Sequence, residues 1–191
     1  MSTPSEAPQL SGEAAVQALQ PILFADNHNG HVLHTYAVLD GAAVPELLDQ
    51  LYGDEPPEFV CLYSGDLEPD MAECAPYLIE LTPDSAFTKW LLSAGWGKKW
   101  GIFAQSPENL KTMRRHFRTF LMVKDPDGKQ VYFRYYDPRV LRVFLPTCTA
   151  GETELLFGPL VSYACEADRP DALLSFRVES GLPKCISSKL N

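Results

Sequence analysis

The segment 130–146 limits the possible folds of this chain more than any other stretch, because a strand pattern runs directly into a helix pattern. Val131 to Tyr136 is aromatic and β-branched, which is the composition of a half-buried strand. Asp137 and Pro138 then predict a helix start, since Asp accepts backbone N–H groups at an N-cap and Pro is tolerated at the first helical position. Apolar residues at helical spacing continue this helix up to Pro146. The fold must therefore accommodate a strand and a helix that are joined without a loop.

The rest of the chain also alternates between strand and helix patterns. Strands are predicted at residues 35–39, 59–63, 77–81, 100–104, 119–123, 131–136, 160–165 and 173–178. Helices are predicted at residues 44–52, 85–94, 107–118, 138–145 and 153–157, and Ser106 is expected to cap the third of them. Asp125 to Gly128 predicts a hairpin turn between two of the strands. We expect an α/β fold: a mixed β-sheet flanked by helices, with a β-hairpin and a short helical C-terminal part.

The length and the composition fit a single domain. The chain has 191 residues, of which 46% are hydrophobic, and no apolar run approaches the roughly 20 residues of a membrane span. We expect a flexible lead-in at residues 1–20, one α/β domain at residues 21–180 and a loose tail at residues 181–191. Residues 1–12 lack the basic and apolar regions of a secretory signal, and the five cysteines form no Cys-x-x-Cys pair. These features predict a protein of a reducing cytoplasm that has no membrane partner.

The charges are divided unevenly along the chain. Residues 1–88 contain no Lys or Arg but 15 of the 25 acidic residues, whereas residues 98–142 hold eleven basic residues against four acidic ones, a local charge of +7. One interpretation is that the two parts neutralise each other within the fold, and the other is that the basic part binds an acidic partner. Nucleic acid is a poor candidate for that partner because the net charge of the whole chain is −9.

No motif in the sequence predicts catalysis or a cofactor. The chain lacks a phosphate-binding loop and a nucleophile elbow, and the Gly-Trp-Gly sequence at residues 95–97 lies between a predicted helix and a predicted strand, the reverse of a dinucleotide site. His28, His31 and His34 have a regular spacing, but neighbouring histidines at this spacing would lie on opposite faces of a strand, and no fourth ligand is nearby. We therefore expect no enzyme activity, no cofactor and no metal, and metal binding by the three histidines stays open as a minor alternative.

The run FRYYDPRVLRVFLP at residues 133–146 resembles the signature of the bacterial type VI secretion adaptor-chaperone family, whose members were long catalogued as a domain of unknown function. Three further segments are supporting matches: YAVLD at residues 36–40, WGKKWGIF at 96–103 and HFRTFLMV at 116–123. The resemblance covers about residues 35–165. It implies a non-enzymatic adaptor that binds a secreted effector in the cytoplasm and loads it onto the valine-glycine-repeat spike protein. The alternative is a small hydrolase or nuclease with a site on the Gly-rich loops.

The residues that we expect to bind partners are mainly aromatic or basic, because aromatic residues and Arg are enriched at the centres of interfaces. They are Trp96, Trp100, Lys111, Arg114, Arg115, Arg118, Arg134, Asp137, Arg139 and Arg142. The basic residues 111–118 form one helix face, which would otherwise be an ordinary solvated face. Arg139 and Arg142 are three residues apart and are expected on one face of the next helix.

Two of these assignments have plain structural alternatives. Asp137 would be a helix cap worth about 1 kcal/mol whether or not it meets a partner. Trp96 and Trp100 would usually belong to the core, but the glycines around them led us to the hypothesis that at least one lines a groove that the effector fills.

Overall fold

The computed structural model describes residues 10, 12–25, 27–28, 31–125 and 127–190. The helices are α1 (Glu13–Leu23), α2 (Leu47–Leu51), α3 (Pro69–Cys74), α4 (Ala86–Gly95), α5 (Leu110–Arg118), α6 (Pro138–Phe144) and α7 (Ala150–Phe157), with 3-10 turns at Gly41–Ala43 and Leu145–Thr147. The strands are β1 (Asn27–His28), β2 (His31–Val32), β3 (His34–Asp40), β4 (Phe59–Cys61), β5 (Pro76–Leu81), β6 (Gly101–Ser106), β7 (Met122–Lys124), β8 (Gln130–Tyr132), β9 (Ser162–Glu166), β10 (Ala172–Glu179) and β11 (Leu182–Lys189). Across these residues, no helix combines the length and the apolar character needed to cross a bilayer.

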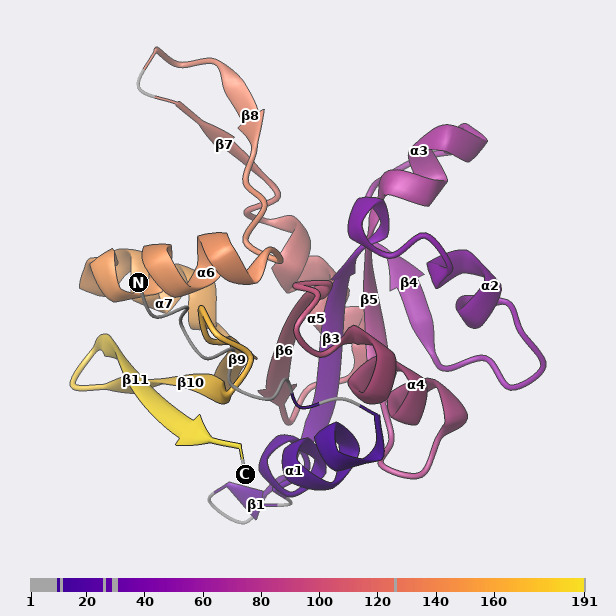
Figure 1. Ribbon diagram of the computed structural model, residues 1–191. Coiled ribbons are helices and arrows are strands. Elements are labelled where there is room, and N and C mark those ends of the chain that lie inside the picture. Colours follow the sequence, from indigo (N-terminus) through magenta and orange to yellow (C-terminus); the bar gives the residue numbers. More distant parts are fainter. Residues whose placement is uncertain (1–9, 11, 26, 29–30, 126, 191) are drawn as a thin grey trace, which may run out of the picture.

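Seven strands form the main sheet, in the order β11-β10-β9-β6-β3-β5-β4 (Figure 1). The α/β class with a hairpin is confirmed, but every pairing in this sheet is antiparallel, whereas we expected a mixed sheet. The reason lies at β3, where Ala37 pairs with Ile79 of β5 on one side and with Phe103 of β6 on the other. Since β5 and β6 both run antiparallel to β3 and are separated by it, the helix between them creates no parallel pair.

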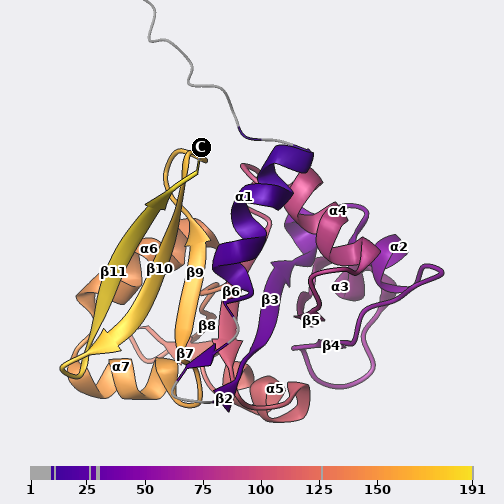
Figure 2. The ribbon, with the colours of Figure 1, turned by 90° about the horizontal axis from the view of Figure 1, so that it is seen from below.

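Helices cover both faces of this sheet. The side chains of β3 alternate: Tyr36 and Val38 pack against α5, α6 and α7, whereas Ala37 and Leu39 pack against α1, α2 and α4. These four side chains are at most 1% exposed, so β3 is buried on both faces. Figure 2 shows α1 on the near side of the sheet and α6 and α7 on its far side. The core therefore has two apolar layers, one on each side of the sheet.

Helix α5 starts later than the sequence predicts. Its cap is Asn109, whose side chain accepts a hydrogen bond of 3.0 Å from the backbone N–H of Thr112. Ser106 is instead the last residue of β6, where it pairs with His34, and its hydroxyl accepts a hydrogen bond from Glu108 N–H. The prediction of a cap at Ser106 is therefore wrong, because strand pairing extends two residues beyond the predicted strand end. Helix α2 is likewise shorter than the predicted helix 44–52.

Two segments that we expected to be irregular contain regular structure. Residues 1–20 were expected to be a flexible lead-in, either disordered or weakly helical. Helix α1 occupies residues 13–23 and its Ala15 and Leu19 are fully buried, so this part is helical but belongs to the packed fold. Strand β11 replaces most of the loose tail expected at residues 181–191. It follows β10 through a two-residue turn in which Ser180 and Gly181 both have positive φ, as a tight hairpin of this kind requires. The sequence does not predict this edge strand, because residues 182–189 include several polar residues and a proline, which is unusual within a strand.

The strands β7 and β8 form a separate hairpin that projects from the body (Figure 1). Its predicted turn is confirmed: Asp125 Oδ1 accepts hydrogen bonds from the N–H groups of Asp127 and Lys129. The strand predicted to reach Tyr136 ends at Tyr132. Tyr135 and Tyr136 turn into the core instead, where they are 1% and 3% exposed. The predicted strand is therefore correct only at its beginning. Its last two aromatic residues, Tyr135 and Tyr136, belong to the apolar core at the base of the hairpin.

Candidate functional site

The base of the hairpin brings together two parts of the chain with opposite charge. Asp40 ends β3, Arg134 follows β8, and Nη2 of Arg134 donates a hydrogen bond to Oδ2 of Asp40. The side chain of Asp40 is 4% exposed, whereas that of Arg134 is 48% exposed. The second oxygen of Asp40 accepts the N–H of Ala42 and so caps the 3-10 turn after β3. This pair is one instance of the internal neutralisation that the uneven charge distribution suggested.

A second buried carboxylate lies a short distance along the chain. Asp137 is the N-cap of α6, as predicted, and its Oδ1 accepts the backbone N–H of Arg139 at 2.9 Å. The same carboxylate accepts three hydrogen bonds from the Arg139 side chain: Nε lies 2.9 Å from Oδ1 and 3.2 Å from Oδ2, and Nη2 lies 2.6 Å from Oδ2. The side chain of Asp137 is 7% exposed and that of Arg139 is 57% exposed. Asp137 therefore caps the helix and holds an arginine whose outer part faces solvent.

The charges of this site act on one another. The hydrogen bond to Asp40 raises the pKa of Arg134, and the charge of Asp137 adds to that rise. Burial opposes the ionisation of Asp137, but hydrogen bonds from the side chain and backbone of Arg139 outweigh burial and lower the pKa of Asp137. The hydrogen bond to Asp137 in turn raises the pKa of Arg139. Both arginines are therefore fixed as cations, and the carboxylates serve as their partners.

Aromatic side chains lie near the carboxylate that holds Arg134, since burial raises the pKa of Tyr63 and the charge of Asp40 adds to that rise. Tyr132 on the hairpin is 54% exposed, and its ring centroid is 5.3 Å from that of Tyr63, which follows β4. Met122 pairs with Tyr132 across the hairpin, so both side chains lie on the same face, and Met122 is 39% exposed. We call Tyr63, Met122 and Tyr132 the aromatic shelf. Exposed aromatic and Met side chains next to Arg are the composition that distinguishes the centre of a protein interface from other surface.

The two tryptophans of the candidate set lie elsewhere, inside the core. Trp96 is 4% exposed and its indole N–H donates a hydrogen bond of 2.7 Å to the backbone oxygen of Pro170. Trp100 is 8% exposed and packs against Trp90, with 5.2 Å between the ring centroids. Gly95 permits this packing, because a Cβ there would lie 2.5 Å from the Trp100 ring. The hypothesis that one of these tryptophans lines an open groove is wrong for this structure, and the core alternative is confirmed.

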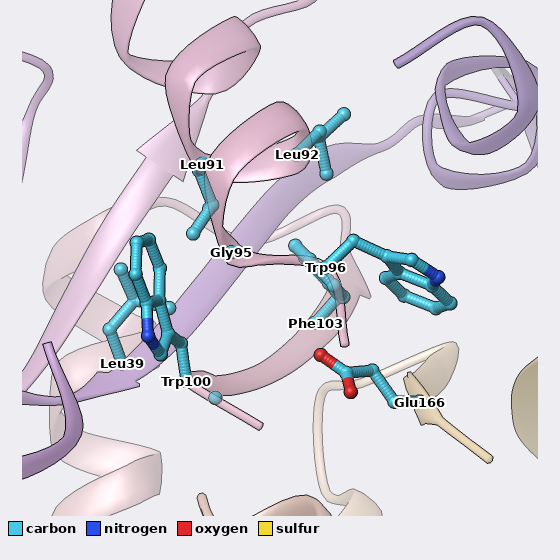
Figure 3. Close-up of a pocket in the computed structure, with 9 residues that line it drawn as sticks. Leu39, Leu91, Leu92, Gly95, Trp96, Trp100, Phe103 and Glu166 are labelled. Atoms are coloured by element: carbon cyan, nitrogen blue, oxygen red, sulfur yellow. The ribbon is translucent and has the colours of Figure 1, made fainter. Parts of the chain in front are cut away.

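A buried carboxylate lies beside these tryptophans. Glu166, the last residue of β9, points toward the segment that carries Trp96 and Trp100 (Figure 3). Its Oε1 accepts the N–H of Lys99 at 3.2 Å, and Lys99 has a positive φ of 60°. Burial raises the pKa of Glu166 to about 7, against the opposing effect of the backbone N–H groups of Lys99 and Gly97. The void between these residues measures about 10 Å³, which is room for roughly one water molecule.

The sequence profile of the domain of unknown function DUF4123 matches residues 35–155. The chain belongs to the DUF4123 family. No curated protein and no solved structure matches it. The matched residues of this DUF4123 protein include both carboxylate–arginine pairs and the aromatic shelf, whereas Glu166 lies outside them. The surface at the base of the hairpin is therefore part of the region that defines the DUF4123 family.

The basic face of α5 lies in a different place in the DUF4123 domain. Lys111 and Arg115 are exposed, while Arg114 and Arg118 are half-buried. Burial raises the pKa of Cys61, and the charges of Arg114 and Arg118 oppose that rise, which places both arginines near β4. Nε of Arg114 is buried and has no hydrogen-bond partner within the described residues. Partner binding by this face stays a prediction.

Arg139 and Arg142, which are expected on one face of α6, make contacts with different parts of the chain. Arg142 donates to the backbone oxygen of Ala167 at 3.3 Å and to Oδ1 of Asp168 at 2.5 Å, and its side chain is only 16% exposed. It therefore fastens α6 to the loop after β9, while Arg139 turns back to its own helix cap. This placement favours a structural role for Arg142.

The structure provides no metal centre in the residues that it describes. Nδ1 of His34 lies 2.7 Å from Oε1 of Glu80, the side chain of a neighbouring strand. His28 and His31 pair through their backbones in the β1–β2 hairpin, and their side chains lie outside the described residues, so metal binding by all three histidines stays untested.

The predicted set of site residues does not include Asp40, Tyr63, Met122 and Tyr132. Asp40 and Tyr63 come from segments far from the signature run, and only the antiparallel pairing of β3, β5 and β4 brings them beside it. One feature of the sequence pointed to Asp40. A carboxylate that directly follows an apolar strand is partly buried, and a buried carboxylate needs a charged or hydrogen-bonding partner.

Proposed function

We propose that this DUF4123 protein is a non-catalytic adaptor, which binds a secreted effector in the bacterial cytoplasm and delivers it to the valine-glycine-repeat spike protein of a type VI secretion apparatus. One observation carries the proposal: two arginines, held by buried carboxylates, present their outer surfaces to solvent on the same chain segment as the exposed Tyr132, which packs on the half-buried Tyr63. Such a surface is suited to recognising another protein. The type VI assignment rests on the resemblance of residues 133–146 to the adaptor signature.

The same geometry argues against acid–base chemistry at this surface. A general base needs a carboxylate or imidazole that can accept a proton from a substrate. Asp137 is committed to Arg139 and to the helix cap, and Asp40 to Arg134 and to the N–H of Ala42. The guanidinium groups, which remain charged, can bind a partner but cannot relay protons.

The hydrolase or nuclease alternative would need a reactive group on the Gly-rich loops. Glu166 is the candidate there, because its pKa of about 7 would suit a general base. The residue is only 5% exposed and the adjoining void holds roughly one water molecule, so no substrate reaches it in this conformation. The adaptor is therefore the function that the geometry supports best.

The test is co-purification. The tagged protein is co-expressed with the product of an adjacent gene and, separately, with the spike protein, and each complex is sized by gel filtration with light scattering. We expect a stoichiometric complex with each partner and no turnover of nucleic acid, peptide or ester substrates by the purified protein. Failure to retain either partner, or turnover that survives repeated purification, would refute the adaptor assignment.

A further inference from the structure

The arginines at the base of the hairpin retain unused hydrogen-bond donors. A guanidinium carries five N–H groups. Arg134 uses Nη2 for Asp40, and Arg139 uses Nε and Nη2 for Asp137. Within the described residues, Nε and Nη1 of Arg134 and Nη1 of Arg139 make no hydrogen bond to protein. The two side chains are 48% and 57% exposed, so these donors remain available for a ligand from outside.

Both arginines are also held in position before any ligand arrives. Asp40 and Asp137 are almost fully buried and are themselves fixed by backbone N–H groups, so each arginine is anchored to a rigid part of the fold. A free arginine side chain loses rotamer freedom when it binds, and this loss weakens binding. Anchoring removes part of that loss. The geometry therefore resembles a preformed receptor for an anion more than an ordinary solvated arginine pair.

The apolar residues near the two arginines favour one class of anion over others. The aromatic shelf supplies apolar surface close to Arg134 in the chain: Tyr132, two residues before Arg134, and its cross-strand partner Met122 are both exposed. A polyphosphate chain could pair with the arginines but has no apolar groups to cover the exposed side chains of Tyr132 and Met122. A peptide that combines carboxylates with apolar side chains complements both the arginines and the shelf.

We propose that Arg134, Arg139 and the aromatic shelf form a docking site for an acidic segment of a partner protein, in which Asp or Glu side chains alternate with apolar ones. The guanidinium donors bind the carboxylates, and Tyr132 and Met122 cover the apolar side chains. This inference deepens the proposed adaptor function, on which it rests for the biological identity of the partner, and it assigns the chemistry of the segment that is recognised.

The experiment uses the full-length protein and a display library of random 12-residue peptides as the probe. Selected sequences are synthesised with a fluorescein label, and their affinities are measured by fluorescence anisotropy together with versions in which Asp and Glu are replaced by Asn and Gln. We expect enrichment of peptides that combine acidic and apolar residues, and at least tenfold weaker binding of the amide versions. Enrichment of basic or purely apolar peptides, or equal binding of the amide versions, would overturn the proposal.

Three variants locate the binding site. Arg139→Gln keeps the helix cap, because Asp137 still accepts a backbone N–H, and Arg134→Lys keeps a cation beside Asp40 but removes the outward fork. Each should weaken the selected peptide at least fivefold at a temperature where circular dichroism shows that the variant is fully folded. Arg177→Gln, an exposed arginine on β10, is the matched control and should bind like the wild type. Equal loss in all three variants, or none in the first two, would show that the peptide binds elsewhere.

Two further results separate this proposal from the adaptor function. Tighter binding of a single-stranded oligonucleotide than of any selected peptide, with the same dependence on Arg134 and Arg139, would replace the acidic peptide by a polyphosphate and overturn the docking proposal. Peptide binding without co-purification of effector or spike would leave the docking site standing and refute the adaptor function alone.

Discussion

Replacement of Glu166 by Gln should stabilise the protein in a way that depends on pH. The carboxyl is buried at the end of β9, and burial raises its pKa from an ordinary value of 4.5 to about 7. Gln has the same shape, and its side-chain oxygen can still accept the N–H of Lys99. The substitution therefore removes the cost of a buried titrating group and keeps its hydrogen bond.

The sign and size follow from linkage between protonation and folding. Below about pH 4.5 the carboxyl is protonated in both states, so Glu166 carries no pH-dependent penalty there. Between pH 4.5 and 7 the unfolded chain ionises first and the folded chain does not, so the free energy of unfolding falls as the pH rises. Above pH 7 the penalty is complete and constant. A pKa difference of two to three units corresponds to about 3 kcal/mol.

The measurement is urea unfolding followed by circular dichroism at intervals from pH 4.5 to 8.5, for the wild type and for Glu166→Gln. The difference in unfolding free energy should grow by about 3 kcal/mol across this range and level off above pH 7. Glu154→Gln, at an exposed position of α7, is the control and should give a flat difference. A flat or falling difference for Glu166→Gln would refute the reasoning, since it would mean that the carboxyl is as ionised in the folded state as in the unfolded chain.

Three further outcomes are expected. Asp137→Ala should lower the free energy of unfolding, measured by urea titration, by about 1–2 kcal/mol, because it removes the α6 cap and leaves Arg139 without its partner. Unchanged stability together with lost partner binding would assign Asp137 to the interface alone. Arg115→Glu with Arg118→Glu should weaken partner pull-down with little change in the melt, whereas a large loss of stability with normal binding would make both arginines internal. In a Trp90→Phe background, the two remaining tryptophans should emit at short wavelength and resist acrylamide quenching with or without effector, and strong quenching would contradict their burial.

The parts of the fold that local patterns encode could be predicted from the sequence. The Asp137 cap, the hairpin turn at Asp125 and the apolar strands depend on residues within a few positions of one another, and all of them appear in the structure. The antiparallel nature of the sheet could not be predicted in this way. The antiparallel sheet arises because β3 lies between β5 and β6, which both come later in the chain. No pattern among neighbouring residues predicts this order of strands.

The sequence could predict the arginines of the candidate site, but it could not predict which carboxylates hold them. Arg134 and Arg139 stand out as basic residues in an aromatic run, but the sequence does not reveal that Asp40 is buried against Arg134. The prediction that Trp96 or Trp100 lines an open groove was wrong because the glycines beside them were misinterpreted. Their glycine neighbours suggested an open edge, whereas Gly95 in fact lets the Trp100 ring pack closely on α4. A glycine signals close approach of other atoms, and the sequence alone does not tell whether those atoms belong to a ligand or to the protein itself.

The central position of β3 also determines when this chain can fold during synthesis. β3 leaves the ribosome before either neighbour, and its second neighbour, β6, is complete only at Ser106. The helices that cover Ala37 and Leu39 (α1, α2 and α4) are made before β6, whereas α5, α6 and α7, which cover Tyr36 and Val38, all follow it, so this second face of β3 stays uncovered longest. Contacts between such distant segments close slowly, because the loop between them must first be ordered. An N-terminal fragment that contains β3 but stops before β6 therefore presents an apolar strand with at least one unpaired edge, which is the kind of segment that aggregates and that folding helpers retain.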